Sequence, residues 1–169
     1  MKTLWLYPAI FSLIMLNPDL SGQSFEKLED YKGVKEVSEA SGIKSPVTLE
    51  VIYDNYVSKK GTTADWGFSV LIEGLDKMIL FDTGTKPEIF ESNFHASGID
   101  PAGINMLVIS HEHTDHTGGI ASLVKMKTGI PVLMPESFSA GFKEHLTGLG
   151  LIPVMVNAPS IICRHLYSS

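Results

Sequence analysis

The amino-acid sequence predicts an α+β domain in which helices pack on a β-sheet. Alternating apolar and polar residues predict strands at 47–54 and 68–72, and a short apolar run predicts the next strand at 78–81. The short connections between these three strands indicate an antiparallel meander. Beyond residue 86, helical and strand patterns alternate, which is typical of a sheet with helices packed on it.

Local signals predict the elements that follow the meander. Pro87 suits the first turn of a helix that carries Phe90 and Phe94 on one face, and Gly98 is a suitable residue just past the end of that helix. Further helices are predicted at 120–127 and 137–149, and further strands at 106–109, 131–134 and 154–156.

The composition limits the classes of function that need to be considered. Hydrophobic residues make up 44% of the 169 residues and charged residues 19%, a balance typical of globular proteins. The net charge of −6 and the absence of a dense Lys/Arg cluster argue against a nucleic-acid partner. Because Cys163 is the only cysteine, a metal ion would have to be held by His and carboxylate side chains.

The N-terminal residues resemble an export signal. Lys2 precedes an almost wholly apolar stretch from Leu4 to Leu16, and the small residues Ser21 and Gly22 offer a cleavage point. We therefore expect a signal peptide at 1–22, a polar N-terminal arm at 23–46 and a periplasmic or secreted protein. The alternative is an N-terminal core helix. The apolar stretch is shorter than the roughly 20 residues of a membrane span, and no later segment is long enough, so we expect no membrane span in the mature chain.

A histidine-rich segment carries the chemistry that the sequence predicts. Residues two apart on an extended segment share a side, so His111 and His113 can reach one metal ion. We expect Asp115 and His116 to point apart where the next helix begins, and to bind a second ion. Two divalent ions, Zn or alternatively Mn or Fe, could share a bridging hydroxide that acts as the nucleophile. Asp115 is also the residue on which we expect catalysis to depend.

The residues around these ligands have simpler expected roles. His111 and His116 are five apart, so they do not share a helical face as in the zincin motif, and we assign Glu112 no catalytic role. Gly118 and Gly119 are expected to leave room for a substrate and to expose helix N-terminal N–H groups to anions. The competing interpretation is a surface loop that merely contains histidines.

The segment from Val108 to Gly119 closely resembles the metal motif of the metallo-β-lactamase superfamily, and Ile79 to Gly84 resembles the strand of that superfamily that ends in Asp. The resemblance implies that Asp82 lies behind the ligands and orients the metal loop. The residues alone would also fit a turn-forming Asp before Gly84. Residues 48–55 and 66–73 are most similar to the branch named for 7,8-dihydropterin-6-methyl-4-(β-D-ribofuranosyl)-aminobenzene-5′-phosphate synthase.

The resemblance also implies a fold and a function. The fold would be the N-terminal half of a metallo-β-lactamase-like αββα sandwich, with a domain at 47–169 that is incomplete at its C-terminus. The second half of that fold would supply further ligands. His165 is a weak substitute for one of them, whereas His145 is expected to be a surface residue and His95 to face solvent. A homodimer could complete the site.

The function implied by the resemblance is metal-dependent hydrolysis of a small-molecule ester, lactone, amide or phosphoester. The alternatives are a truncated non-catalytic remnant and a module that binds a metal or metabolite without turnover.

Overall fold

The computed structural model describes residues 26–27, 47–57, 59–163 and 166–168. The chain forms two compact units, one of residues 42–157 and one of residues 1–41 with 158–169. The predicted signal peptide at 1–22 and nearly all of the predicted arm at 23–46 lie outside the described residues. Within the part of the chain that the structure describes, no helix has the length and apolar character needed to cross a membrane.

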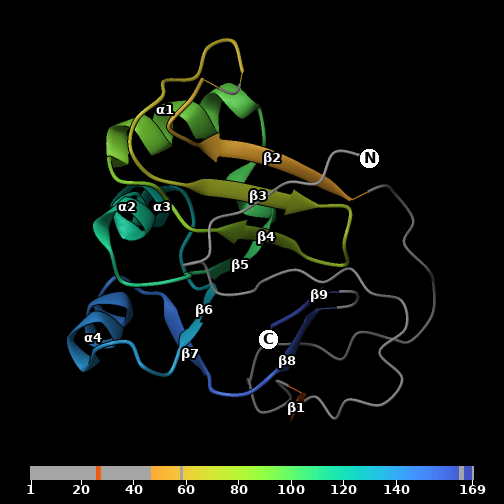
Figure 1. Ribbon diagram of the computed structural model, residues 1–169, viewed down its shortest axis with the longest axis vertical. Coiled ribbons are helices and arrows are strands. Elements are labelled where there is room, and N and C mark those ends of the chain that lie inside the picture. The colour runs from red at the N-terminus through yellow and green to blue at the C-terminus, as the bar shows by residue number, and fades with distance from the viewer. Residues whose placement is uncertain (1–25, 28–46, 58, 164–165, 169) are drawn as a thin grey trace. The chain divides into compact units, whose positions relative to one another are not determined.

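A six-stranded mixed sheet forms the centre of the larger unit, with the strand order β2-β3-β4-β5-β6-β7 (Figure 1). The strands β2, β3 and β4 pair antiparallel, as the meander predicted, and β4 to β7 pair parallel. Their bounds are Thr48–Tyr53 for β2, Ser69–Glu73 for β3, Met78–Phe81 for β4, Ile104–Val108 for β5, Pro131–Pro135 for β6 and Ile152–Val156 for β7.

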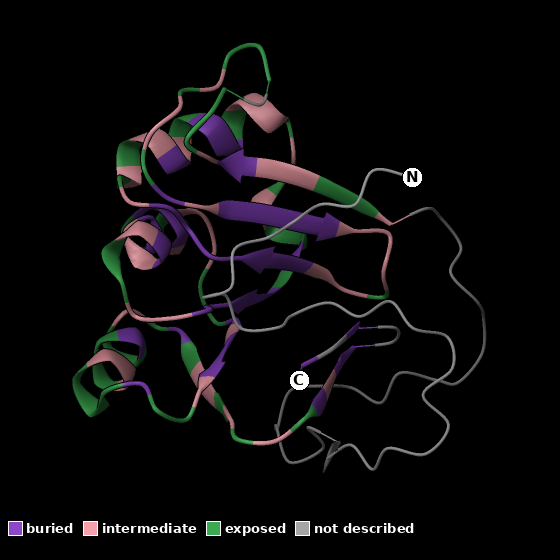
Figure 2. Ribbon diagram, in the orientation of Figure 1, coloured by how far each residue is buried: buried purple, intermediate pink, exposed green. Residues whose placement is uncertain are grey.

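Helices connect the parallel strands and cover one face of the sheet. Their bounds are Pro87–Ser97 for α1, Thr114–Thr117 for α2, Ile120–Met126 for α3 and Ala140–Gly148 for α4, and a 3-10 turn, η1, spans Pro101–Gly103. On this face Leu71, Leu80 and Leu107 of neighbouring strands join the helix residues Phe90 and Leu123 in one core cluster. Burial is deepest along the middle strands, whereas β2 and β7 are more exposed at the edges (Figure 2).

Side chains alternate between the two faces along each strand, and those on the opposite face of the sheet are also apolar. Seven of these side chains are at most 8% exposed: Val70, Ile72, Ile79, Phe81, Met106, Val108 and Leu133. In an αββα sandwich each sheet packs against helices on one face and against the other sheet on the second face. Two apolar faces therefore agree with the prediction that this sheet is half of such a sandwich.

The smaller unit contains a three-stranded sheet in the order β1-β8-β9, with bounds Glu26–Lys27, Ser160–Cys163 and Leu166–Tyr167. None of these strands was predicted from the sequence. The strand β1 pairs parallel with β8, and β8 pairs antiparallel with β9. In this sheet the backbone N–H of Ser168 donates to the carbonyl of Ser160 at 2.9 Å.

Candidate metal centre

The histidine-rich segment spans the loop after β5 and the first residues of α2. The strands β4 and β5 are parallel, and Phe81 pairs with Val108 at the ends where both strands stop. The residues that follow the two strands, Asp82 and Ser110, are therefore brought to the same edge of the sheet. Open α/β sheets place their ligand sites at this carboxyl edge.

Three predicted ligands converge at this edge. His111, His113 and Asp115 each offer one ligand atom, and these atoms all lie within 4.8 Å of one another. Two nitrogen ligands on opposite sides of one zinc ion would be separated by at most about 4.2 Å, twice the usual bond length. The three side chains therefore need only small movements to bind one divalent ion, and their His/Asp chemistry suits such an ion.

His116 lies against this group. The centre of its ring is 4.0 Å from that of His111, and its Nε2 atom is 3.3 Å from Oδ2 of Asp115. Asp115 and His116 therefore do not point apart as we expected. Both residues lie in α2, where neighbouring positions are separated by about 100° around the helix axis and do not point to opposite sides as in a strand, so the two side chains can approach one another.

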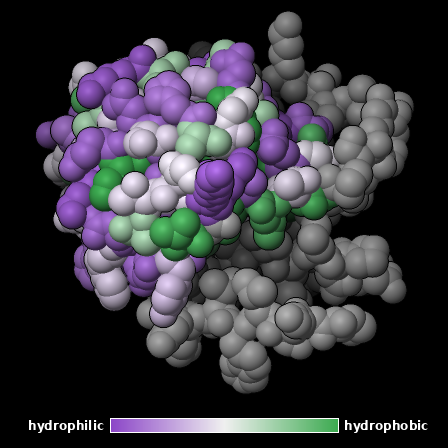
Figure 3. All heavy atoms as spheres, turned by 90° about the horizontal axis from the view of Figure 1, so that it is seen from above, coloured by the Kyte–Doolittle hydropathy of each residue, from purple (hydrophilic) through white to green (hydrophobic). Residues whose placement is uncertain are grey.

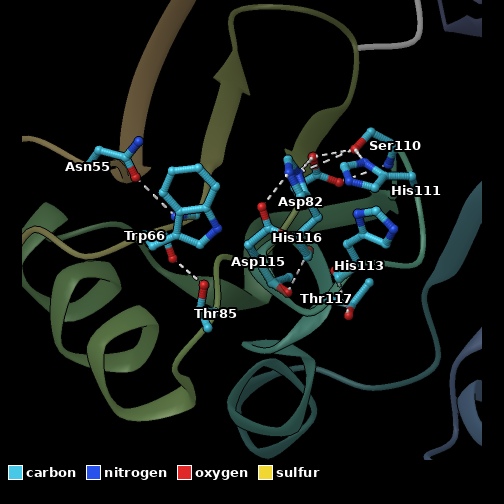
Figure 4. A network of polar contacts seen from close by, with 12 residues as sticks. Asn55, Trp66, Asp82, Thr85, Ser110, His111, His113, Asp115, His116 and Thr117 are labelled. Atoms are coloured by element: carbon cyan, nitrogen blue, oxygen red, sulfur yellow. Dashed lines mark hydrogen bonds and ion pairs between the residues drawn. The ribbon is translucent and has the colours of Figure 1, made fainter. Parts of the chain in front are cut away.

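Asp82 is the fully buried carboxylate beneath these ligands (Figure 4). Its Oδ1 atom accepts a hydrogen bond from the backbone N–H of Ser110 at 2.8 Å, and its Oδ2 atom accepts one from Ser110 Oγ at 2.7 Å. Oδ2 also lies 2.7 Å from Nδ1 of His116. Asp82 thus contacts the ring of His116, as a residue that orients this ligand would have to do.

These contacts select the tautomers of two histidines. Because a carboxylate only accepts hydrogen bonds, His116 donates from Nδ1 to Asp82, and its Nε2 atom is the ring nitrogen that faces Oδ2 of Asp115. Ser110 gives its hydroxyl proton to Asp82, so Ser110 Oγ accepts from Nδ1 of His111 at 2.9 Å. The Nε2 atom of His111 consequently carries no proton and can bind a metal ion.

The two histidines differ in their affinity for protons. Burial lowers the pKa of His111 below its ordinary 6.5, and the neighbouring His116 lowers it further. Burial also opposes protonation of His116, but the hydrogen bond and the charge of Asp82 outweigh it, so the pKa of His116 is raised. As the pH falls, His111 therefore stays neutral, and able to bind a metal ion, to a lower pH than His116 does.

Ser110 is the residue of this network that sequence reasoning missed. It is 6% exposed, and it connects Asp82 to both His111 and His116. The available signal was a hydroxyl residue directly before the first ligand and at the end of a buried strand. That position alone does not reveal which side chains the hydroxyl contacts.

The loop between β2 and β3 packs against the metal loop (Figure 4). The Phe68 N–H donates to the carbonyl of Asp115 at 3.1 Å, and the Gly67 N–H donates to Oδ1 of Asn55 at 3.2 Å. A Cβ atom on Gly67 would lie 2.6 Å from the same Asp115 carbonyl, so only glycine permits this approach. Trp66 is 67% exposed, and its carbonyl accepts a hydrogen bond from Thr85 Oγ1.

The two glycines after the motif have a different role from the one we expected. A Cβ atom on Gly118 would lie 1.8 Å from the carbonyl oxygen of Thr85, and one on Gly119 would lie 2.2 Å from that of Thr83. The Gly118 N–H already donates to the carbonyls of Gly84 and Thr114. The prediction that these glycines leave room for a substrate was therefore wrong, because their space is filled by the loop after β4.

The remaining histidines do not join the centre within the described part of the chain. His95 lies on α1 and His145 on α4, and both are exposed, as predicted for surface residues. His165, the weak substitute for a missing ligand, lies outside the described residues.

Comparisons with known proteins identify the family. The sequence profile of the metallo-beta-lactamase superfamily matches residues 63–153, which is more than half of the chain. This chain belongs to the metallo-beta-lactamase superfamily. Members of the superfamily are metal-dependent hydrolases. The fold usually binds divalent metal ions, and the matched residues include the whole cluster at 111–116.

Two proteins of Methanocaldococcus jannaschii resemble the chain in sequence. A 7,8-dihydropterin-6-methyl-4-(beta-D-ribofuranosyl)-aminobenzene-5′-phosphate synthase is 40% identical over 82 residues, which cover 45% of this chain and 28% of that protein. An uncharacterised protein is 34% identical over 77 residues, which cover 46% of this chain and 29% of that protein. The match thus spans less than a third of the length of these relatives.

A solved structure confirms the fold. The metallo-beta-lactamase fold protein YhfI from Bacillus subtilis superposes with a TM-score of 0.53 and 16% sequence identity, over 69% of this chain and 50% of that protein. The α+β prediction and the resemblance to part of a metallo-β-lactamase fold are both confirmed.

Proposed function

We propose that this chain carries the metal site of a hydrolase, in which His111, His113 and Asp115 hold a divalent ion. The convergence of their ligand atoms within 4.8 Å is the observation that carries the proposal. His116, whose Nε2 atom lies 3.3 Å from Oδ2 of Asp115, is the residue for a second ion, which would lie between these two side chains.

Such an ion, for which Zn, Mn and Fe are suitable, supplies Lewis acidity that polarises a carbonyl or phosphoryl group and makes water acidic enough to react near neutral pH. The chain's own residues hold the imidazoles of His111 and His116 in place, through Ser110 and Asp82, and Asp115 adds negative charge. The proposed substrate is a small-molecule ester, lactone, amide or phosphoester. The exposed indole of Trp66, on the loop that contacts Asp115, offers it an apolar surface.

The test replaces Asp115, whose carboxylate belongs to the three-ligand group. We expect Asp115→Ala to abolish turnover of a panel of phosphodiesters, lactones and β-lactams and to leave the circular dichroism spectrum unchanged. The control is Asp76→Ala, because Asp76 is an exposed residue of the turn between β3 and β4. The control variant should keep the wild-type rate.

Elemental analysis of the purified wild-type chain separates the alternatives. Bound metal with turnover supports the hydrolase. Bound metal without turnover of any substrate would indicate a metal- or metabolite-binding module. A folded chain with neither metal nor turnover would indicate a non-catalytic remnant and would overturn the proposal.

A further inference from the structure

Glu112 lies between two metal-site histidines, and its carboxylate reaches another element of the fold. Its Oε2 atom accepts a hydrogen bond from Ser139 Oγ at 2.8 Å, and its Oε1 atom accepts one from the backbone N–H of the same serine. Ser139 is 27 positions further along the chain and is the N-cap residue of α4. The metal loop is thus tied to the start of a helix that contributes no ligand.

The start of α4 is a favourable place for this carboxylate. The first N–H groups of a helix lack partners within the helix and carry a partial positive charge, which attracts anions. Ser139 Oγ, which donates to Glu112, also accepts from the Phe142 N–H at 3.2 Å. One chain of hydrogen bonds therefore runs from Glu112 into the first turn of α4, and charge-assisted bonds of this kind are stronger than neutral ones.

The helix α4 is anchored in the hydrophobic core. Leu146 of α4 is fully buried in the core cluster on the helix-covered face of the sheet. The loop itself has no regular secondary structure between the end of β5 and the start of α2. Its conformation between His111 and His113 consequently depends on contacts that come from outside the loop.

We infer that Glu112 is a positioning residue for the metal site, which holds His111 and His113 in place by fixing the loop between them to α4. This inference rests on the proposed function. Ordering a loop costs conformational entropy, and a loop that is already ordered does not incur that cost when the ion binds. The tether to Ser139 therefore raises the affinity for the ion, although Glu112 is not itself a ligand.

The competing role for Glu112 is a purely structural one, in which its carboxylate caps α4 and has no effect on metal binding. The two roles differ in a measurable way. A structural cap changes the thermal stability of the metal-free protein. A positioning residue also changes the dissociation constant for Co²⁺ and the visible absorption spectrum of the bound ion, which reports its ligand geometry.

The experiment is a Co²⁺ titration of the whole chain and of three variants, at a temperature where all are folded. We expect Glu112→Ala to weaken Co²⁺ binding about tenfold, the lower end of the range for residues that support metal ligands. Glu112→Gln keeps an acceptor for the Ser139 N–H and should stay within about threefold of wild type. Glu144→Ala, an exposed glutamate in the middle of α4, is the matched control and should bind as wild type does.

Ser139→Gly tests the contact from its other end. Glycine is well tolerated at an N-cap, so α4 is little affected, but the hydroxyl that Glu112 contacts is gone. We expect Co²⁺ affinity between those of wild type and Glu112→Ala. This variant keeps the inference testable if Glu112→Ala does not fold.

The outcomes separate the inference from the proposed function. Wild-type affinity and spectrum in both Glu112→Ala and Ser139→Gly would overturn the positioning role and leave the metal site standing. Equal losses in Glu112→Ala and Glu112→Gln with wild-type affinity in Ser139→Gly would overturn it too, because the charge of Glu112 beside the ligands, and not its contact with Ser139, would then be responsible. Failure of the wild-type chain to bind Co²⁺ would overturn the proposed function, and the inference with it.

Discussion

Asp82 has a backbone φ of 54°, a left-handed conformation that residues with a side chain seldom adopt. The short polar side chain of Asp tolerates it better than most. At this φ the chain turns sharply after β4, and the buried carboxylate meets both Ser110 and His116. Strained backbone of this kind is concentrated at functional sites, where the surrounding contacts enforce it.

The prediction at the residue scale concerns Ser110. Ser110→Ala removes the donor to Asp82 and the acceptor for His111, so the ring of His111 loses the bond that fixes its tautomer. We expect metal affinity to fall about tenfold or more, as for other residues that orient ligands. A competition titration with a chromogenic zinc chelator measures the change.

The matched control for this prediction is Ser122→Ala. Ser122 is also fully buried, and its Oγ atom donates to Glu91 on α1, away from the metal loop. This variant should lose stability by about 1 kcal/mol, as expected for one buried hydrogen bond, and keep its metal affinity. If Ser110→Ala also bound metal normally, the proposed route from Asp82 to His111 would be wrong.

At the scale of elements, the turn between α2 and α3 approaches the loop after β4 very closely. The Gly118 N–H donates to the carbonyl of Gly84 at 2.8 Å, and the Thr83 N–H donates to the carbonyl of His116 at 2.8 Å. Two backbone segments that come this close leave no room for a side chain between them. This contact holds α2, and with it Asp115 and His116, beside Asp82.

The prediction at this scale compares the free energy of unfolding of two variants in which a glycine in or next to a helix is replaced by alanine. Gly118→Ala places a Cβ atom 1.8 Å from the Thr85 carbonyl, so the segments must separate, and we expect a loss of at least 3 kcal/mol in the free energy of unfolding, the upper part of the range for overpacking. Gly141→Ala, in α4, meets nothing within 4 Å and should be neutral or up to about 1 kcal/mol stabilising. Urea unfolding of both variants measures the difference.

Equal stabilities for the two glycine variants would contradict the close approach at Gly118. A Gly118→Ala protein with normal stability and weakened metal binding would instead show that the two segments can separate at little cost.

Sequence patterns predicted most elements of the larger unit, because the signals that set them are local. For α1, Pro87 gives the start and Gly98, with a φ of 76°, gives the end. The strand β7 begins two residues earlier than predicted, with Pro153 inside it. Because β7 lies at the edge of the sheet, a residue without an N–H group is tolerated there.

For the site, the sequence indicated which side chains belong together and could not predict how they contact one another. His111, His113, Asp115 and His116 were recognised as ligands from spacing and residue type. Asp115 was assigned with His116 to a second ion, whereas the structure brings Asp115 together with His111 and His113. The hydroxyl of Ser110 and the tie from Glu112 to Ser139 depend on residues 27 or 28 positions apart that only the folded sheet brings together. The close packing at Gly118 was missed for the same reason.

At the scale of the whole molecule, metal binding and stability are expected to be linked. An ion that binds only the folded state stabilises it by about 2.7 kcal/mol when its free concentration is 100 times its dissociation constant. We therefore expect a chelator to lower the Tm by about 10 °C for a chain of this size. Differential scanning calorimetry with and without the chelator measures the shift.

His113→Ala is the control for the chelator experiment, because it removes a ligand from an exposed side chain that the core does not need. Its Tm should not respond to the chelator. A response as large as that of wild type would place the stabilising ion elsewhere in the chain.

The exposure of apolar side chains at the surface was not predicted from the sequence. In the view of Figure 3, apolar side chains form small groups between hydrophilic ones. Among the described residues, the large exposed hydrophobic ones include Leu49, Tyr56, Val57 and Trp66, all in β2 or in the loop after it. Periodicity identified the strand but gave no indication that these apolar residues would be exposed.

The separation along the chain between Asp82 and the residues it contacts has a kinetic consequence. Ser110 and His116 lie 28 and 34 positions away, and they meet Asp82 only where the parallel strands β4 and β5 end together. The hairpins of β2, β3 and β4 need only local contacts and can form earlier on the folding pathway. A metal ion then stabilises interactions that are absent from the early folding nucleus, so it should slow unfolding far more than it speeds folding.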